Sequence, residues 1–298
     1  MIQSMPDYEL LNCFPRFESL WPRIAHLPVP AQIEAWHRLY IEHWPELLEL
    51  QITCHAEEQL DWRQVASERI FPRFPAALNA MRQASAILQE ILPGIYRKTC
   101  VALSLDLPVV FVIYAGLGCG AGWAAGYGGK PAVLFGLENI AAEGWVDQLT
   151  LTGMTAHELG HLAYFAWLEQ AGLAQGVGDW WTLFEEGFAQ RCEHVILGKE
   201  TWHMAHGAGV TGWLEWCQAN RGWLAGEYLR CMEEGLPVRQ FFGSWFDIQG
   251  YKQTGYYLGH EVVRSLEVDL SLREIACLPQ LETLVRAALN RLKNDSGE

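Results

Sequence analysis

The stretch LTGMTAHELGHLAYFAW, residues 151–167, contains the pattern that decides the fold: a histidine and a glutamate followed, three positions on, by a second histidine. Residues four apart lie on the same face of a helix, so His157 and His161 are spaced to bind one metal ion side by side. Glu158 lies one step round the helix from His157, where it reaches a bound water rather than the metal. Three protein ligands and a water make a catalytic zinc site, so the stretch predicts a metal-binding helix.

The third ligand has to come from a later segment. A metzincin would have the pattern HExxHxxGxxH, but Tyr164 and Trp167 occupy its glycine and third-histidine positions, which excludes that class. Asp179, which follows Gly178, is one candidate, because an aspartate also serves as a zinc ligand.

The stretch TLFEEGFAQRCEHVIL, residues 182–197, offers two further candidates, Glu185 and Glu186, on a helical pattern. The helical period places Glu185, rather than Glu186, on the side of the apolar residues Phe188 and Ala189. The residues by themselves therefore leave both glutamates open as the third ligand, beside the aspartate.

The two stretches together resemble a known arrangement. HELGH followed by LFEEGFAQ is similar to the HExxH and WLNEGFA pair of the aminopeptidase N type and, more loosely, to the two-helix zinc site of thermolysin. GYYLGHEVV, residues 255–263, resembles a tail motif of bacterial chains described as predicted zinc-dependent proteases. The resemblance covers residues 131–264 and implies a gluzincin-type zinc metallopeptidase. Matched residue by residue, it implies a general base, Glu158, and three zinc ligands: His157, His161 and Glu186.

The later helix also offers a group that stabilises the reaction. Tyr256 and His260 are four residues apart, and a phenol or imidazole facing the metal would donate a hydrogen bond to the oxyanion of peptide hydrolysis. Tyr257 is an alternative donor. The competing interpretation is a tyrosine packed in a helix interface, with its hydroxyl bonded to backbone.

Four other polar residues have a functional and a structural interpretation. Gln190 is a candidate to orient a ligand histidine, or a solvent-facing side chain. His203 and His206 resemble a small metal pair, but their glycine-rich surroundings predict a solvated loop. Glu138, in the stretch GLEN, is a shortened form of the GAMEN motif with which aminopeptidase N relatives hold a substrate amine. A loop glutamate that begins a helix is the simpler interpretation.

The hydrophobic patterning predicts an α+β fold that is mainly helical, and the resemblance implies a zincin-like catalytic lobe. Short β-rich runs at residues 109–116 and 132–137 indicate strands joined by a glycine-rich loop, the second being an edge strand that pairs with substrate. The predicted divisions are a helical N-terminal lobe, 1–98, and a metallopeptidase domain, 99–298, with a small antiparallel sheet at 99–137, metal-binding helices at 149–197 and C-terminal helices at 213–292.

Composition narrows the function classes. With 35 acidic and 21 basic residues the formal net charge is −14, and no basic cluster is present, so nucleic acid is not an expected partner. The first residues lack a basic region followed by an apolar run, and the longest uncharged stretch is too rich in glycine for a membrane helix. Eight scattered cysteines without a CxxC pair favour reduced thiols. A cytoplasmic protein without a membrane partner is expected.

The predicted activity is zinc-dependent hydrolysis of a peptide bond in a peptide or protein substrate. A Zn2+ cofactor would polarise the scissile carbonyl and activate a water, while Glu158 takes the proton of that water and passes it to the leaving amine. The alternative is a catalytically silent, peptidase-like binding module that retains the metal site. The intact Glu158 counts against this alternative, because a structural zinc site has no use for a base.

Overall fold

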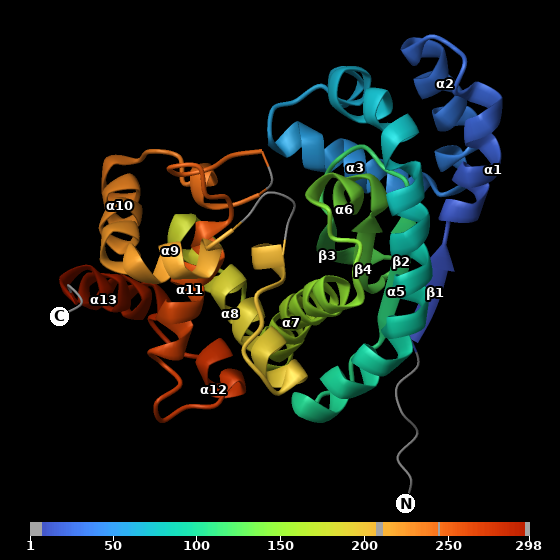
Figure 1. Cartoon of the computed structure of the whole chain (residues 1–298). Coiled ribbons are helices and arrows are strands. Elements are labelled where there is room, and N and C mark those ends of the chain that lie inside the picture. Colours follow the sequence, from blue (N-terminus) through green and yellow to red (C-terminus); the bar gives the residue numbers. More distant parts are fainter. Residues whose placement is uncertain (1–7, 207–210, 244, 296–298) are drawn as a thin grey trace, which may run out of the picture. The chain divides into compact units, whose positions relative to one another are not determined.

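A computed structural model describes residues 8–206, 211–243 and 245–295 of the chain. The chain forms two compact units: Met1–Arg97 with Pro108–Thr155, and Lys98–Leu107 with Ala156–Glu298. The structure is mainly helical with one small sheet, which confirms the α+β prediction (Figure 1). The units do not follow the predicted boundary at residue 98, since the sheet belongs to the first unit. Among the described residues, no helix is both long enough and apolar enough to cross a membrane.

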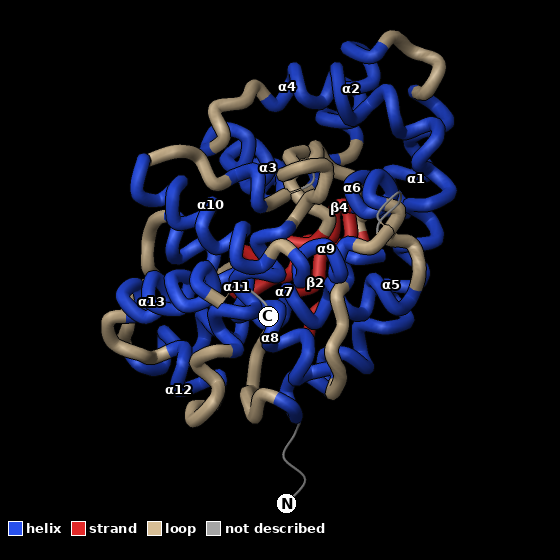
Figure 2. Tube along the Cα trace, turned by 60° about the vertical axis from the view of Figure 1, so that its left-hand side comes forward, coloured by secondary structure: helices blue, strands red, loops and turns tan. Residues whose placement is uncertain are grey.

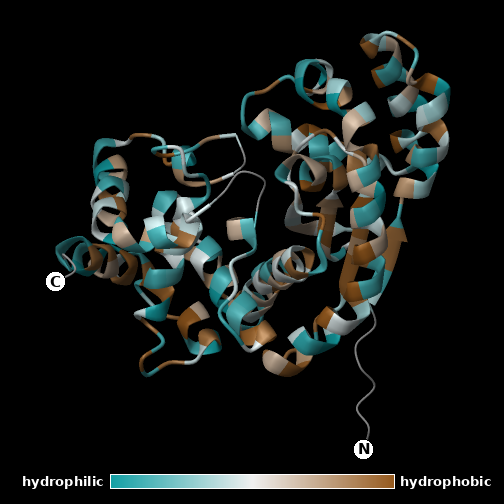
Figure 3. Ribbon diagram, viewed as in Figure 1, coloured by the Kyte–Doolittle hydropathy of each residue, from teal (hydrophilic) through white to brown (hydrophobic). Residues whose placement is uncertain are grey.

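The sheet of the first unit is mixed rather than antiparallel as predicted. Its order is β1-β2-β4-β3; β2 pairs in parallel with β1 and β4, and β3 pairs antiparallel with β4. Every residue of β2 is buried, as expected for an apolar strand with parallel neighbours on both sides. Strands β2 and β4 are largely brown in the hydropathy view (Figure 3). The strands are β1 (Tyr8–Asn12), β2 (Val109–Tyr114), β3 (Gly122–Tyr127) and β4 (Lys130–Gly136).

The predicted edge strand is not at an edge. β4 lies between β2 and β3, so both of its sides are already hydrogen-bonded and no side is left for substrate. The outer neighbour, β3, comes from the stretch predicted to be a glycine-rich loop. Gly128 and Gly129 have φ of +60° and +71°, which makes a two-residue turn whose twist suits a hairpin. The turn and the pairing with β4 therefore form a strand that its own glycines and alanines do not favour.

The first 98 residues were predicted to be wholly helical, but β1 is a strand. Its pairing with β2 aligns Tyr8 with Val109 and Asn12 with Ile113, so partners 101 positions away (113 − 12) stabilise it. Helix α5 runs along the sheet (Figure 1), and the ring of Tyr96 contacts those of Tyr8 and Phe111. The helices of this unit are α1 (Phe14–Ile24), α2 (Val29–Leu39), α3 (Pro45–Glu57), α4 (Trp62–Val65), α5 (Phe74–Ala102) and α6 (Leu137–Glu143).

Helix α5 continues through Pro93, a residue that usually ends a helix. A proline inside a helix removes one backbone hydrogen bond and costs about 3 kcal/mol. The buried side chains of Leu92, Ile95 and Tyr96 lie on both sides of it, and their burial offsets this loss. Val101 and Leu103, in the segment 99–137 that was predicted to form the sheet, consequently lie in the last turn of α5 and the turn after it.

The second unit consists of helices, and Figure 2 shows how small a part of the whole chain is strand. Two close contacts between helices hold it together. A Cβ at Gly160 of α7 would lie 3.0 Å from the Cα of Ala189 on α8, and one at Gly187 of α8 would lie 2.0 Å from the carbonyl carbon of Gly259 on α11. The helices are α7 (Gln148–Ala171), α8 (Asp179–Leu197), α9 (Trp213–Ala219), α10 (Arg221–Glu234), α11 (Thr254–Arg264), α12 (Leu272–Ala276) and α13 (Leu281–Asn294), with short turns at His203–His206 and Arg239–Phe241.

Candidate metal centre

Helix α7 presents the predicted histidine pair on one face. His157 and His161 are one turn apart, both are buried, and their Nε2 atoms lie 3.1 Å from each other. One imidazole N–H can donate to the lone pair of the other ring, and without that proton the two nitrogens could bind one cation together.

Helix α8 brings a carboxylate to the same point. Oε2 of Glu186 lies 3.1 Å from Nε2 of His157 and 3.4 Å from Nε2 of His161. Glu185 faces the other nitrogen of His161, with 3.3 Å between Oε1 and Nδ1. The two glutamates that the sequence left open thus have different places: Glu186 joins the three converging donors, and Glu185 lies behind one of them. Asp179 begins α8, where its carbonyl accepts the hydroxyl of Tyr228, and it is not part of this group.

The spacing of the three donors matches a zinc site. Ligands at about 2.0–2.1 Å from a tetrahedral ion lie about 3.3 Å from each other, because a tetrahedron's edge is about 1.6 times the bond length. The three measured separations are 3.1, 3.1 and 3.4 Å. Two imidazole nitrogens and one carboxylate oxygen therefore have the spacing of one triangular face of a tetrahedral site, and they could hold a metal ion.

Burial and charge set the protonation of the donors. Burial lowers the pKa of His157 to about 4, so its imidazole is neutral at pH 7. Burial also acts to lower the pKa of His161, but the carboxylates of Glu186 and Glu185 raise it well above its usual value. For Glu186, burial acts to raise the pKa, and the two histidines nevertheless bring it well below its usual value. The ionised carboxylate of Glu186 thus faces the protonated ring of His161, and a bound cation would displace that proton.

Glu158 has the environment of a general base. It is buried beside the donors, and burial raises the pKa of its carboxyl to about 7. A base is most effective when its pKa lies near the working pH, since it then both accepts and returns a proton. A cation bound nearby would lower this pKa and favour the ionised form.

The two aromatic candidates on α11 point in different directions. The ring centroid of Tyr256 lies 5.4 Å from that of His157, and its hydroxyl makes no hydrogen bond within the described ranges. Burial and the carboxylates of Glu186 and Glu158 raise the pKa of Tyr256 well above its usual value, so the phenol keeps its proton. Tyr257 is buried against Trp202, as the packing interpretation expects.

His260, predicted as a second donor candidate, belongs to another cluster. Its Nε2 lies 3.0 Å from Nη1 of Arg191 and 3.2 Å from Nδ1 of His194, and its Nδ1 lies 3.1 Å from Glu261. Gln190, predicted as a residue that orients a ligand histidine, binds the backbone carbonyl of Thr201 and the ring of His194 instead. The structure does not bring either residue to the three donors.

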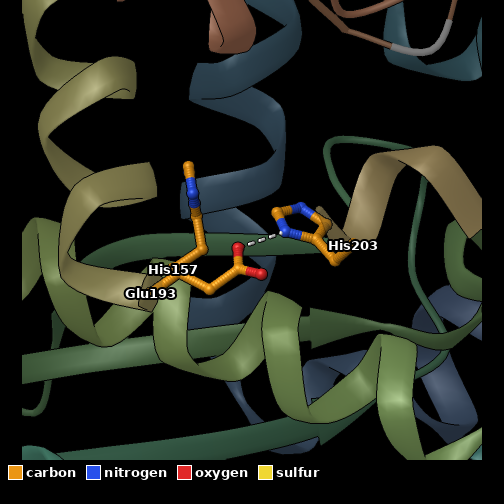
Figure 4. A group of neighbouring side chains, drawn as sticks. All are labelled: His157, Glu193 and His203. Atoms are coloured by element: carbon orange, nitrogen blue, oxygen red, sulfur yellow. Dashed lines mark hydrogen bonds and ion pairs between the residues drawn. The ribbon is translucent and has the colours of Figure 1, made fainter. Parts of the chain in front are cut away.

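Two residues that the sequence did not assign to the site complete its second layer. Glu193 is fully buried, and its Oε2 lies 2.8 Å from Nδ1 of His203, toward which its carboxylate points (Figure 4). His157 offers a nitrogen within 4.8 Å of both, and its Nδ1 has no hydrogen-bond partner in the described part of the chain. His203 is thus buried rather than solvated as predicted. Glu193 was identifiable in advance because it follows Glu186 by two helical turns on the same face.

Glu138 has a structural role in the first unit, where it binds the backbone of the loop after β2. Its two carboxylate oxygens accept the backbone N–H groups of Gly116 and Gly118, at 2.7 and 3.0 Å. It lies in the first turn of α6, as the simpler interpretation predicted, and its side chain is buried. Since both oxygens are already bonded, we do not assign it to a substrate amine.

Comparison with known proteins finds no matching family model, no matching curated protein and no matching solved structure. The assignment of the site therefore rests on its own residues and their geometry.

Proposed function

We propose that this chain is a zinc-dependent metallopeptidase of the gluzincin type, with His157, His161 and Glu186 as the ligands. The observation that supports it best is the triangle of three donor atoms with edges of 3.1–3.4 Å, together with a buried glutamate next to one of them. A structural zinc site is closed by four protein ligands, whereas three ligands and an adjacent base are typical of a hydrolytic site. In this proposal the second unit is a zincin-like catalytic domain.

The donor set fits zinc better than the harder divalent cations. Magnesium and calcium prefer oxygen ligands, while two imidazoles and one carboxylate suit zinc. A zinc ion bound there would act as a Lewis acid toward a carbonyl and would lower the pKa of a water.

The remaining steps belong to the protein. The carboxylate of Glu158 accepts a proton from the attacking water and returns it to the nitrogen of the leaving amine, so the group is regenerated in each cycle. The hydroxyl of Tyr256 donates a hydrogen bond to the oxygen of the scissile carbonyl as its negative charge develops. Because that charge exists only during the reaction, the contact stabilises the transition state more than the bound substrate.

The test measures metal content and hydrolysis on the same preparations. We expect about one zinc per chain by elemental analysis and cleavage of a mixed peptide library by mass spectrometry. Glu158→Gln keeps shape and zinc, but hydrolysis should fall by about 10²–10⁴-fold. Glu169→Gln is the matched control, because Glu169 is an exposed glutamate of the same helix.

A second pair of variants tests the ligand assignment. Glu186→Ala should lose zinc during dialysis, while Asp179→Ala should keep it. Zinc loss in Asp179→Ala alone would contradict the proposed ligand set. A zinc-loaded wild type that cleaves no peptide of the library would support the silent binding module instead.

A further inference from the structure

Two cysteines of the first unit are brought together by a clamp between helix α3 and the loop after β2. Oε1 of Gln51 accepts the backbone N–H of Leu117 at 2.9 Å, and Nε2 of His55 lies 3.0 Å from the carbonyl of Leu117. Gln51 and His55 flank Cys54 on α3, and Leu117 precedes Cys119 by two positions. These two contacts, the clamp, therefore hold the helix backbone near Cys54 against the loop backbone near Cys119.

The thiols meet at the carbonyl of Gln51. Sγ of Cys119 lies 3.5 Å from this oxygen. Cys54 lies three positions after Gln51 on the same helix, one turn further along α3, so its side chain leans back toward this carbonyl. The largest influence on the pKa of each thiol is the other thiol, as expected of neighbouring groups. Both residues are half-buried, so a small reagent reaches them.

We propose that Cys54 and Cys119 form a dithiol that a hydroperoxide oxidises to an intramolecular disulfide. In the first step the sulfur of Cys54, as the thiolate, attacks one peroxide oxygen; the O–O bond breaks, an alkoxide or hydroxide leaves and takes up a proton, and Cys54 becomes a sulfenic acid. In the second step the sulfur of Cys119 attacks that of Cys54; the S–O bond breaks, the S–S bond forms and water leaves with the thiol proton of Cys119. The peroxide gains the two electrons that the thiols lose.

The order of the two cysteines follows from their influence on each other. The neighbouring Cys119 thiol lowers the pKa of Cys54, whereas the Cys54 thiol, together with burial, raises the pKa of Cys119. The thiolate is the nucleophile in thiol chemistry, so Cys54 reacts with the peroxide and Cys119 resolves the product. This proposal does not depend on the zinc site, which lies in the second unit.

The loop has little freedom to carry Cys119 away. Besides the clamp at Leu117, the backbone N–H groups of Gly116 and Gly118 are held by Glu138. Closure of the disulfide therefore requires a small movement of side chains rather than a search by the loop. We expect the second step to outpace capture of the sulfenic acid by an added trapping reagent.

The experiment treats the reduced full-length protein with hydrogen peroxide, alkylates the remaining thiols and maps the peptides by mass spectrometry. The expected product links the Cys54 and Cys119 peptides with the loss of two hydrogen atoms, and the other six cysteines are recovered alkylated. In Cys119→Ser, dimedone should trap a sulfenic acid on Cys54. In Cys54→Ser, Cys119 should be recovered as the alkylated thiol.

Cys277 provides the matched control, because it is half-buried and its thiol also lies near a helix carbonyl, that of Trp167 at 3.9 Å. Cys277→Ser should leave the disulfide unchanged, and Cys277 should react with peroxide at least about tenfold more slowly than Cys54. Gln51→Ala removes one arm of the clamp, so dimedone should trap more Cys54 while the first step keeps its rate. Recovery of Cys54 and Cys119 as free thiols after Cys277 has been oxidised would overturn the proposal.

Discussion

Gly187 follows the proposed ligand Glu186, and its replacement by alanine tests whether close helix packing positions the site. A Cβ there would lie 2.0 Å from the carbonyl carbon of Gly259, whereas real Cβ contacts are not shorter than 3.0 Å. Helices α8 and α11 must therefore separate locally by about 1 Å (3.0 − 2.0). Overpacking of this kind costs about 1–3 kcal/mol, and a clash with backbone belongs at the upper end of that range. At about 2–4 °C per kcal/mol, Gly187→Ala should lower the Tm by about 6–12 °C.

The same displacement has a consequence for the metal. Ligand distances tolerate only about 0.2 Å, so even a part of this 1 Å separation, if α8 takes it up by moving relative to α7, would weaken zinc binding at Glu186. Thermal unfolding with and without a chelator measures stability, and competition with a chromophoric chelator measures zinc affinity. We expect Gly187→Ala to reduce both the thermal stability and the zinc affinity.

The matched control is Gly226→Ala, in the interior of α10. A Cβ at Gly226 would meet only the flexible side chain of Lys293, at 3.6 Å, so the better helix propensity of alanine should raise stability by about 0.5–1 kcal/mol. If the two variants changed the Tm equally, the close contact between α8 and α11 would be refuted.

Three further predictions concern single groups of the second unit. Tyr256→Phe deletes only the hydroxyl, so kcat should fall by about 10²–10³ with little change in KM, zinc content or Tm; a variant that melts earlier but turns over normally would show a structural tyrosine. Glu193→Gln removes a buried carboxylate charge that lies near His157, so zinc affinity in a chelator competition should fall about 10–100-fold, and equal affinity would argue against this second layer. Burial lowers the pKa of His194 to about 4, so the unfolded chain binds a proton between pH 6.5 and 4 that the folded chain does not. The contribution of His194 to stability is therefore complete above pH 6.5 and is lost as the pH falls to 4. Over this range the Tm of the metal-free wild type should drop more than the Tm of His194→Gln. Parallel curves of Tm against pH for the two proteins would contradict this prediction.

The local part of the site was predictable and the long-range part was not. The spacing of His157 and His161 needs only the geometry of one helix, which the apolar pattern around them indicates. The choice between Glu185 and Glu186 depends on how α8 is rotated against α7. That rotation follows from contacts such as the one between Gly160 and Ala189, which no single segment encodes.

The sheet shows the same limit. The apolar runs of β2 and β4 predicted strands, but their direction of pairing depends on where the connecting chain leads. β1 has no strand pattern strong enough to stand out in its helical surroundings, and β3 owes its form to the turn at Gly128 and Gly129. Likewise, local rules predict that Pro93 ends a helix. α5 continues past it because the side chains around it are buried, which the local sequence does not reveal.

The parallel pairing of β1 with β2 has a consequence for synthesis of the chain. β1 ends at Asn12, and its last partner is Ile113, so the ribosome adds 101 residues (113 − 12) before the ladder is complete. At about 5–20 residues per second, the segment waits about 5–20 s without its partner strand. The hairpin of β3 and β4 spans only a two-residue turn and closes within microseconds of its synthesis. β1 therefore remains unpaired while a third of the chain is synthesised. During this interval a holdase chaperone has time to bind it.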